Sequence, residues 1–98
     1  MVAQQNYAYL LRCADGSFYC GWTTDLPRRL AAHNAGLGAK YTRGRLPVKL
    51  VGSWRFETRS QAMKFEARIK RLSRSEKERL SGNGENSTAI ALILQVDL

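Results

Sequence analysis

Apolar and aromatic side chains dominate two short stretches near the start of the chain, residues 6–13 and 17–22. The first stretch contains no glycine or proline, and both are rich in aromatic residues, which favour extended backbone. The segment between them, Ala14-Asp15-Gly16, is typical of a tight hairpin turn. The pattern therefore predicts two antiparallel strands joined by a short loop.

The length of this loop decides which side chains share a face of the hairpin, because side chains alternate along a strand. A two-residue turn would place Tyr9 and Tyr19 on opposite faces. A three-residue loop needs Gly16 in the left-handed conformation and sets Tyr9 opposite Gly21. In that register Tyr7 joins the other two tyrosines on one face, whereas a one-residue slip reverses the whole set. We predict the three-residue loop, since a shared tyrosine face makes chemical sense.

A helix is predicted over residues 26–35. Thr24 or Asp25 can cap its start. Pro27 suits its first turn, and Gly36 can end it. Helical spacing gives the segment a buried side and a polar side. We expect the buried side to comprise Leu26, Leu30 and Ala31, and the polar side to comprise Arg28, Arg29 and His33.

The remaining pattern predicts one more strand and two more helices. Residues 48–56 have the composition of a third strand. A capping box at Thr58 to Gln61 begins a helix that runs to about Leu72. A second capping box at Ser73 to Glu76 begins a short helix that ends near Leu80. The positions of the longer helix that should face the core are Ala62, Phe65, Ile69 and Leu72.

The predicted order is therefore strand, strand, helix, strand, helix, helix, and a chain of 98 residues suffices for one domain. We assign residues 1–80 to that domain. Residues 81–98 comprise a polar, glycine-bearing linker and an apolar tail that begins at Thr88. The tail could be a strand on the sheet edge, a helix on the domain or a dimerisation segment, and its role stays open.

Charge narrows the class of partner. The chain has 16 lysines and arginines against 8 acidic residues, a formal net charge of +8 and an isoelectric point near 10.1. Most of the basic residues are arginines, whose planar fork suits bidentate phosphate contacts. This excess indicates a polyanionic partner, with nucleic acid favoured over an anionic membrane surface. A basic protein that is merely soluble is the alternative.

Other classes of protein fit less well. No stretch approaches the ~20 apolar residues of a membrane span, so no membrane association is expected. The polar N-terminus, Met1 to Asn6, does not resemble a signal peptide. Two cysteines form no zinc set, and in either hairpin register Cys13 and Cys20 point to opposite faces, so we expect no disulfide. A reducing, cytoplasmic setting is expected.

Candidate chemistry begins with Arg29 and the only histidine, His33, which are four residues apart and share one face of the predicted helix. A cation beside a titratable base can serve a phosphate, although such a pair is often only a solvated surface. The glycine-rich segment 36–47 is expected to be a basic loop that contacts phosphates, or else a solvated connector. Tyr41 in this loop could stack on an exposed base. The candidate nucleic-acid contacts of the loop are Lys40, Tyr41, Thr42, Arg43 and Arg45.

Taken in order, these residues resemble the GIY-YIG nuclease domain. Tyr7-Ala8-Tyr9 is followed ten residues later by Tyr19-Cys20-Gly21. Arg29 and His33 come next, and then Glu66, the one acid between residues 58 and 75. The likeness covers roughly residues 6–80 and is greatest to small stand-alone bacterial members. It is also marked in the stretches Cys20–Arg29, His33-Asn34 and Gly38–Arg43.

The chain departs from the family pattern at a few positions. Tyr7 stands where the family name has glycine, and Trp22 stands where some relatives place a lysine. Glu78 occupies a position where some relatives carry an asparagine, and we leave its role unassigned. The tail after Leu80 does not match the family.

The resemblance implies an α+β fold in which a three-stranded antiparallel sheet is flanked by helices. It also implies a metal-dependent phosphodiesterase that cuts nucleic acid. In this pattern Glu66 holds one divalent cation, Mg²⁺ or Mn²⁺, and Arg29 clamps the scissile phosphate. Tyr9 or Tyr19 positions or deprotonates the attacking water, while His33 accepts that proton or orients the tyrosine.

The leading hypothesis is a DNA endonuclease that acts in processes such as repair or recombination, with DNA favoured over RNA. The first alternative is a binding module of the same fold, either inactive or dependent on a protein partner for specificity, because a domain of this size leaves little surface for recognition. A third reading is a ribosome- or RNA-associated protein whose tyrosines belong to the core. Substrate structure, sequence preference and oligomeric state are left open.

Overall fold

A three-stranded antiparallel sheet organises the computed structural model, which describes residues 5–82. Its strands are β1 (Asn6–Arg12), β2 (Phe18–Thr23) and β3 (Lys49–Phe56), arranged in the order β2-β1-β3. The first strand of the chain is therefore the central one. The sheet and its flanking helices confirm the α+β fold expected from the sequence.

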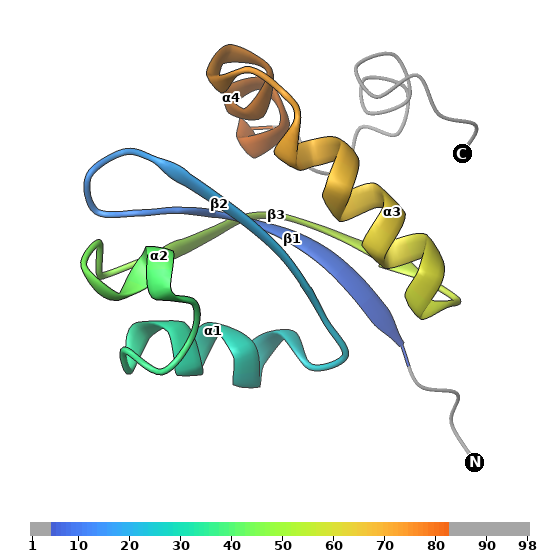
Figure 1. Ribbon diagram of the computed structural model, residues 1–98, viewed down its shortest axis with the longest axis horizontal. Coiled ribbons are helices and arrows are strands. Elements are labelled where there is room, and N and C mark those ends of the chain that lie inside the picture. The colour runs from blue at the N-terminus through green and yellow to red at the C-terminus, as the bar shows by residue number, and fades with distance from the viewer. Residues whose placement is uncertain (1–4, 83–98) are drawn as a thin grey trace.

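Helices cover both faces of this sheet (Figure 1). One face carries α1 (Leu26–Asn34) and the short α2 (Lys40–Arg43). The opposite face carries α3 (Arg59–Lys70) and α4 (Arg74–Gly82). The element order matches the prediction except for α2, which lies inside the segment that we expected to be an irregular loop.

The hairpin between β1 and β2 has the predicted three-residue loop. Gly16 has a φ of +84°, in the left-handed region, and its amide donates to the Cys13 carbonyl at 2.9 Å. The Cys13 amide then donates to the Ser17 carbonyl at 2.8 Å. In this register Tyr9 pairs with Gly21 and Leu11 pairs with Tyr19. The tyrosines therefore share one face of the sheet, as the register prediction required.

Two small hydrophobic cores lie on opposite faces of the sheet. The first packs Ala8, Leu10 and Cys20 of the sheet against helices α3 and α4, through Phe65, Ile69 and Leu80. The second, on the α1 face, is built from Tyr9, Leu11, Cys13 and Val48. Cys13 and Cys20 are both free and buried in different cores, so the expected absence of a disulfide is confirmed for them. The predicted core positions of α3 are also confirmed, with Ala62, Phe65 and Ile69 buried and Leu72 partly buried.

Helix α1 begins where the sequence predicted, but its buried side differs. The Asp25 carboxylate accepts a hydrogen bond from the Arg28 amide at 3.2 Å, and Pro27 lies in the first turn. Ala31, expected on the buried side, is exposed, whereas His33, expected to stay on the polar side, is completely buried. That expectation was wrong because the hydroxyl groups that satisfy the His33 ring come from other elements.

The segment after α1 folds back onto the hairpin loop. Arg45 lies at the centre of this contact: its Nε donates to Asp15 at 3.0 Å, and its backbone carbonyl accepts from the Ala14 amide at 2.8 Å. A second guanidinium nitrogen of Arg45 donates to the Tyr41 carbonyl at 2.7 Å. These bonds hold α2 beside the hairpin, where an unsupported glycine-rich loop was expected.

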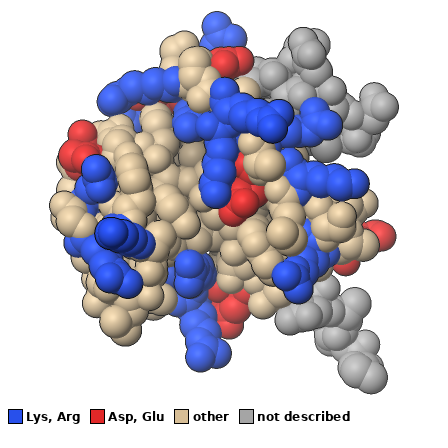
Figure 2. Space-filling view, in the orientation of Figure 1, with Lys and Arg blue, Asp and Glu red and all other residues tan. Residues whose placement is uncertain are grey.

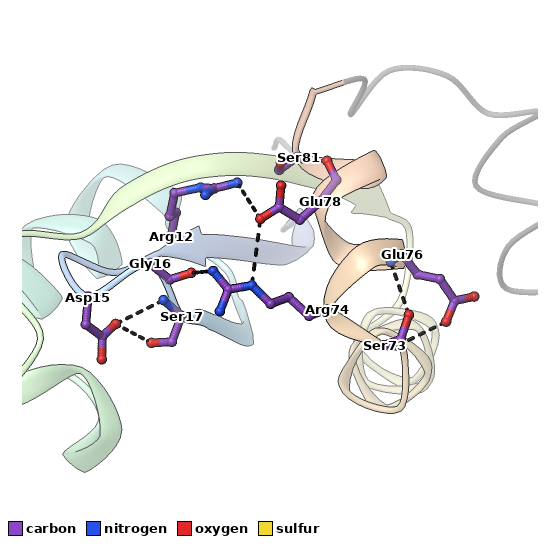
Figure 3. Close-up of polar contacts among 9 residues, drawn as sticks. All are labelled: Arg12, Asp15, Gly16, Ser17, Ser73, Arg74, Glu76, Glu78 and Ser81. Atoms are coloured by element: carbon purple, nitrogen blue, oxygen red, sulfur yellow. Dashed lines mark hydrogen bonds and ion pairs between the residues drawn. The ribbon is translucent and has the colours of Figure 1, made fainter.

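Figure 2 shows lysine and arginine side chains spread over the visible face, with only scattered acidic ones among them. Some of these charges are used to attach α4 to the sheet, as Figure 3 shows. Glu78 lies between Arg12 at 3.5 Å and Arg74 at 3.9 Å, and Arg74 donates to the Gly16 carbonyl at 3.1 Å. Glu78, unassigned from the sequence, therefore joins α4 to the central strand.

Both capping boxes form. Thr58 and Gln61 exchange side-chain to backbone hydrogen bonds at the start of α3, and Ser73 and Glu76 do the same before α4. Helix α4 extends to Gly82, just past its predicted end. Of the linker and tail assigned to residues 81–98, the first two residues belong to α4, and residues 83–98 lie outside the described part of the chain. Within the described part of the chain, no helix has the length and apolar character needed to cross a membrane.

The core on the α3 face makes a quantitative prediction. Ile69 is completely buried, so Ile69→Ala should lower the free energy of unfolding by about 2–5 kcal/mol, through lost burial and a residual cavity. Met63 on the same helix is 41% exposed, and Met63→Ala should cost less than about 1 kcal/mol. Urea denaturation of both variants measures the difference. Equal losses would contradict the assignment of this face as core.

Candidate active site

Three aromatic rings from three different elements meet on the α1 face of the sheet. The Tyr9 ring on β1 lies 6.5 Å from the Tyr19 ring on β2, measured between centroids. The His33 ring on α1 lies 5.9 Å from Tyr9 and 5.3 Å from Tyr19. The hairpin register makes this possible, because it puts both tyrosines on the side where α1 packs.

Two glycines make room for these rings. A Cβ atom at Gly21 would lie 2.5 Å from the Tyr9 hydroxyl, so the tyrosine ring occupies the space that a side chain would fill. A Cβ atom at Gly38 would lie 2.3 Å from Nδ1 of His33. Both distances are far below van der Waals contact, so larger residues would displace the tyrosine or the histidine. The hollow predicted at Gly21 is confirmed.

A continuous set of hydrogen bonds links the site. The Tyr9 hydroxyl lies 2.9 Å from Nε2 of His33, and Nε of Arg29 donates to the same hydroxyl at 3.4 Å. Tyr19 lies near enough to the Arg29 guanidinium to help raise its pKa. On the other side of the ring, Nδ1 of His33 lies 2.9 Å from Oγ1 of Thr42. Arg29 is thus held by Tyr9, and Tyr9 is held by Arg29 and His33.

Burial and charge fix the protonation of these groups. Burial raises the pKa of Tyr9, although the hydrogen bond and positive charge of Arg29 oppose part of that rise. Burial lowers the pKa of His33, and the nearby Arg29 lowers it further. The hydrogen bond to Tyr9 raises the pKa of Arg29. At neutral pH the site therefore holds a cationic arginine, a neutral histidine and a protonated Tyr9.

The predicted nucleic-acid contacts of the α2 region divide into two groups. Tyr41 is 39% exposed, its ring stacks on Tyr19 with centroids 6.0 Å apart, and the Arg45 guanidinium lies 4.0 Å from its centroid. Lys40 and Arg43 are exposed beside it. Thr42, however, is completely buried and faces His33, so its assignment as a nucleic-acid contact was wrong. Helical spacing within α2 turns it inward.

Glu66 comes from the layer on the other side of the sheet. Its side chain is 18% exposed and pairs with Lys70, one helical turn later, at 3.7 Å. The Glu66 backbone carbonyl accepts a hydrogen bond from the Cys20 thiol at 3.6 Å, which places this turn of α3 against β2. The structure thus gathers Tyr9, Tyr19, Arg29 and His33 into one group, with Glu66 held separately on α3.

The donor set bears on metal binding. Among residues 5–82, no group of three or more histidine, cysteine, aspartate or glutamate side chains could hold a metal ion. A partly exposed carboxylate such as Glu66 fits a cation that keeps most of its water and also binds substrate oxygens, as Mg²⁺ does. A soft metal that needs several protein ligands fits poorly.

Sequence reasoning missed the inward roles of Gly38 and Thr42. Both lie within the segment Gly38–Arg43, which was singled out for its likeness to the nuclease family but was treated as a surface loop. The sequence feature that could have indicated these roles is the single histidine, His33, followed within ten residues by Gly38 and Thr42. Only the packing of α2 against α1 shows that these residues surround the histidine ring.

Comparisons with known proteins agree with this fold. Residues 5–79 match the family described as GIY-YIG catalytic domain. The UPF0213 protein BH0048 of Halalkalibacterium halodurans is 48% identical over 90 residues, which cover 88% of this chain and 96% of that protein. The UPF0213 protein NP_0776A of Natronomonas pharaonis is 56% identical over 79 residues, which cover 81% of this chain and 93% of that protein.

A solved structure is also similar. The solution NMR structure of the UPF0213 protein BH0048 from Bacillus halodurans has a TM-score of 0.53 and 43% sequence identity. The similarity covers 95% of this chain and 99% of that chain. With the family match spanning most of the described residues, these likenesses show that the chain belongs to the GIY-YIG catalytic domain family.

Proposed function

We propose that this protein is a metal-dependent endonuclease that hydrolyses phosphodiester bonds in DNA, in processes such as repair or recombination. The observation that carries the proposal is the hydrogen bond of Arg29 to the Tyr9 hydroxyl, in a group that also holds the Tyr19 and His33 rings. A cation placed beside hydroxyl groups suits a phosphate, since it can neutralise charge on the phosphoryl oxygens while a hydroxyl orients water. Membership of a catalytic-domain family supports the same conclusion.

The two tyrosines have different environments, which suggests different roles. Tyr9 is 2% exposed and its hydroxyl is engaged by His33 and Arg29, so it positions the guanidinium. Tyr19 is half-buried and borders the exposed Tyr41. In the proposed mechanism Tyr19 positions or deprotonates the attacking water, and Arg29 clamps the scissile phosphate.

Glu66 would hold one divalent cation, Mg²⁺ or Mn²⁺, together with water and phosphate oxygens. When bound, such a cation would polarise the phosphoryl group and stabilise the leaving oxygen. Lys70, which pairs with Glu66 and whose side chain is 54% exposed, would have to release the carboxylate for a cation to bind there. The role of Glu66 rests on the family pattern and on its partly exposed carboxylate.

The DNA would lie across the α2 side of the site. Lys40 and Arg43 are exposed there and can contact phosphates, and Arg45 lies over the Tyr41 ring. Tyr41 is 39% exposed, but its ring already stacks on Tyr19 and contacts the Arg45 guanidinium, so an unpaired base would stack there by displacing one of them. DNA is favoured over RNA, although the contacts named here read phosphates and ring faces that both polymers share.

A binding module that depends on a protein partner is the second candidate. The pairing of Glu66 with Lys70, in a different layer from Arg29, favours it, because a carboxylate occupied by a lysine does not by itself make a metal site. In that case the domain would bind DNA but cut only when a partner supplied specificity or completed the site.

Arg29→Ala tests the phosphate clamp. We expect it to reduce nicking of supercoiled DNA in Mg²⁺ by about 10²- to 10³-fold, the usual cost of removing a group that stabilises transition-state charge. Arg79→Ala removes the same charge from exposed α4 and serves as the control, with a loss of less than about threefold expected. Equal nicking by Arg29→Ala and wild type would refute the proposed site.

Glu66→Gln tests the metal ligand. We expect nicking to fall by at least about 10²-fold while DNA binding, measured by fluorescence anisotropy, stays the same or tightens because a negative charge near phosphate has been removed. Glu57 is an exposed acid outside the proposed site, so Glu57→Gln should leave both nicking and DNA binding unchanged. If wild type binds DNA but neither it nor the variants cut any DNA tested, the partner-dependent module is the better description.

The buried histidine predicts how stability changes with pH. Because the pKa of His33 is lowered in the folded protein, the unfolded chain binds more protons once the pH falls through 6.5. The contribution of His33 to stability is therefore complete above that pH and is lost as the pH falls below it. The pKa values of Asp15 and Glu76 are lowered from 3.8 and 4.5, so these carboxylates lose their contributions to stability only in stronger acid. Urea unfolding should give wild type a lower free energy of unfolding at about pH 5.5 than at about pH 7.5. The free energy of unfolding of His33→Gln should differ little between the two pH values. A wild-type protein equally stable at both values would contradict the burial of a neutral ring.

A further inference from the structure

The His33 ring is enclosed by two hydroxyl groups. Nε2 lies 2.9 Å from the Tyr9 hydroxyl and Nδ1 lies 2.9 Å from the Thr42 hydroxyl, while the residue itself is completely buried. A neutral imidazole has one N–H and one bare nitrogen, so it donates one of these hydrogen bonds and accepts the other. The two distances alone do not say which nitrogen carries the proton.

Thr42 settles the direction. Its hydroxyl has one proton, which it donates to the Ala39 carbonyl at 3.0 Å, and a carbonyl oxygen can only accept. The hydroxyl oxygen must then accept the bond from the ring. Nδ1 of His33 therefore carries the hydrogen.

The same direction follows along the rest of the network. With its hydrogen on Nδ1, the neutral ring presents a bare Nε2, which accepts the proton of the Tyr9 hydroxyl. The Tyr9 oxygen keeps its lone pairs for Nε–H of Arg29 at 3.4 Å. The hydrogen bonds thus run one way, from Arg29 through Tyr9, His33 and Thr42 to the Ala39 carbonyl.

The opposite tautomer fits poorly. A hydrogen on Nε2 would point at the Tyr9 oxygen, and the proton of the buried Tyr9 hydroxyl would lose His33 as its acceptor. The bare Nδ1 would then need the Thr42 proton, and the bond to Ala39 would be lost. The ring has little freedom to avoid this conflict, since even a Cβ atom at Gly38 would lie 2.3 Å from Nδ1.

We propose that Thr42 is a positioning residue that fixes the Nδ1–H tautomer of His33 and, through Tyr9, the orientation of the Arg29 guanidinium. Thr42 is completely buried and acts through the residues in this chain of hydrogen bonds. Its effect on catalysis rests on the proposed nuclease function, whereas its effect on the histidine tautomer does not.

The single histidine of the chain makes the tautomer directly measurable. Histidine labelled with ¹⁵N gives one imidazole, whose two nitrogen shifts in the full chain at neutral pH distinguish Nδ1–H from Nε2–H. We expect Nδ1–H in the wild type, and finding Nε2–H there would overturn the proposal without any variant. The Nε–H signal of Arg29 should be visible and slow to exchange because it donates to Tyr9.

Two substitutions separate the hydroxyl from the shape of the side chain. Thr42→Val keeps the branched shape but removes the oxygen, so we expect the tautomer to shift towards Nε2–H and the Arg29 Nε–H signal to broaden. Thr42→Ser keeps the oxygen and should restore both signals. A Thr42→Val protein that folds and retains the wild-type tautomer would overturn the proposal. If that variant does not fold, the wild-type and Thr42→Ser spectra still decide it.

Nicking of supercoiled DNA then tests the catalytic consequence. Thr42→Val should cut about tenfold to a hundredfold more slowly than wild type, as expected for a small misplacement of a reacting group, and Thr42→Ser should recover most of the rate. A shifted tautomer with an unchanged rate would refute the positioning role. A wild-type protein with the predicted tautomer but no nicking would instead count against the proposed nuclease function. In that case the Arg29 Nε–H signal would still test whether Thr42 orients the guanidinium.

Discussion

The close approach of the Tyr9 ring to the backbone of Gly21 is the constraint on which the site depends. It requires the two residues to lie opposite each other across the hairpin, which in turn requires a three-residue loop with Gly16 at positive φ. Only this pairing puts Tyr9 and Tyr19 on the side of α1. The histidine and the arginine both bond to a tyrosine whose position is set by the length of a turn.

Local sequence rules sufficed for the three strands and for helices α1, α3 and α4, whereas α2 was missed and the hairpin register was chosen because it lets the tyrosines share a face. The turn glycine, the capping residues of α1, α3 and α4, and the periodic apolar positions of α3 each express a preference of a few neighbouring residues, which a sequence makes visible. The burial of His33 and the inward direction of Thr42 were not accessible in this way. Each is a polar residue that supplies a hydrogen-bond partner to the other inside the protein, and that pairing arises from the packing of α2 on α1.

The sheet also divides the family residues between two layers. Arg29 and His33 belong to α1, while Glu66 belongs to α3 on the opposite face. The contact of the Cys20 thiol with the Glu66 carbonyl ties α3 to β2, the strand that also carries Tyr19. β2 is therefore the element through which a displacement on one layer would reach the other, and it lies at an edge of the sheet.

The central strand has a consequence for engineering. Along β1, Ala8 and Leu10 face the α3 core while Tyr9 and Leu11 face the α1 side, so neighbouring residues serve different purposes. Repacking at the even positions can raise thermal tolerance without touching the hydroxyl network, and redesign at the odd positions can alter chemistry on an unchanged scaffold. The alternation of a single strand thus offers two independent sets of adjustable positions within one short peptide.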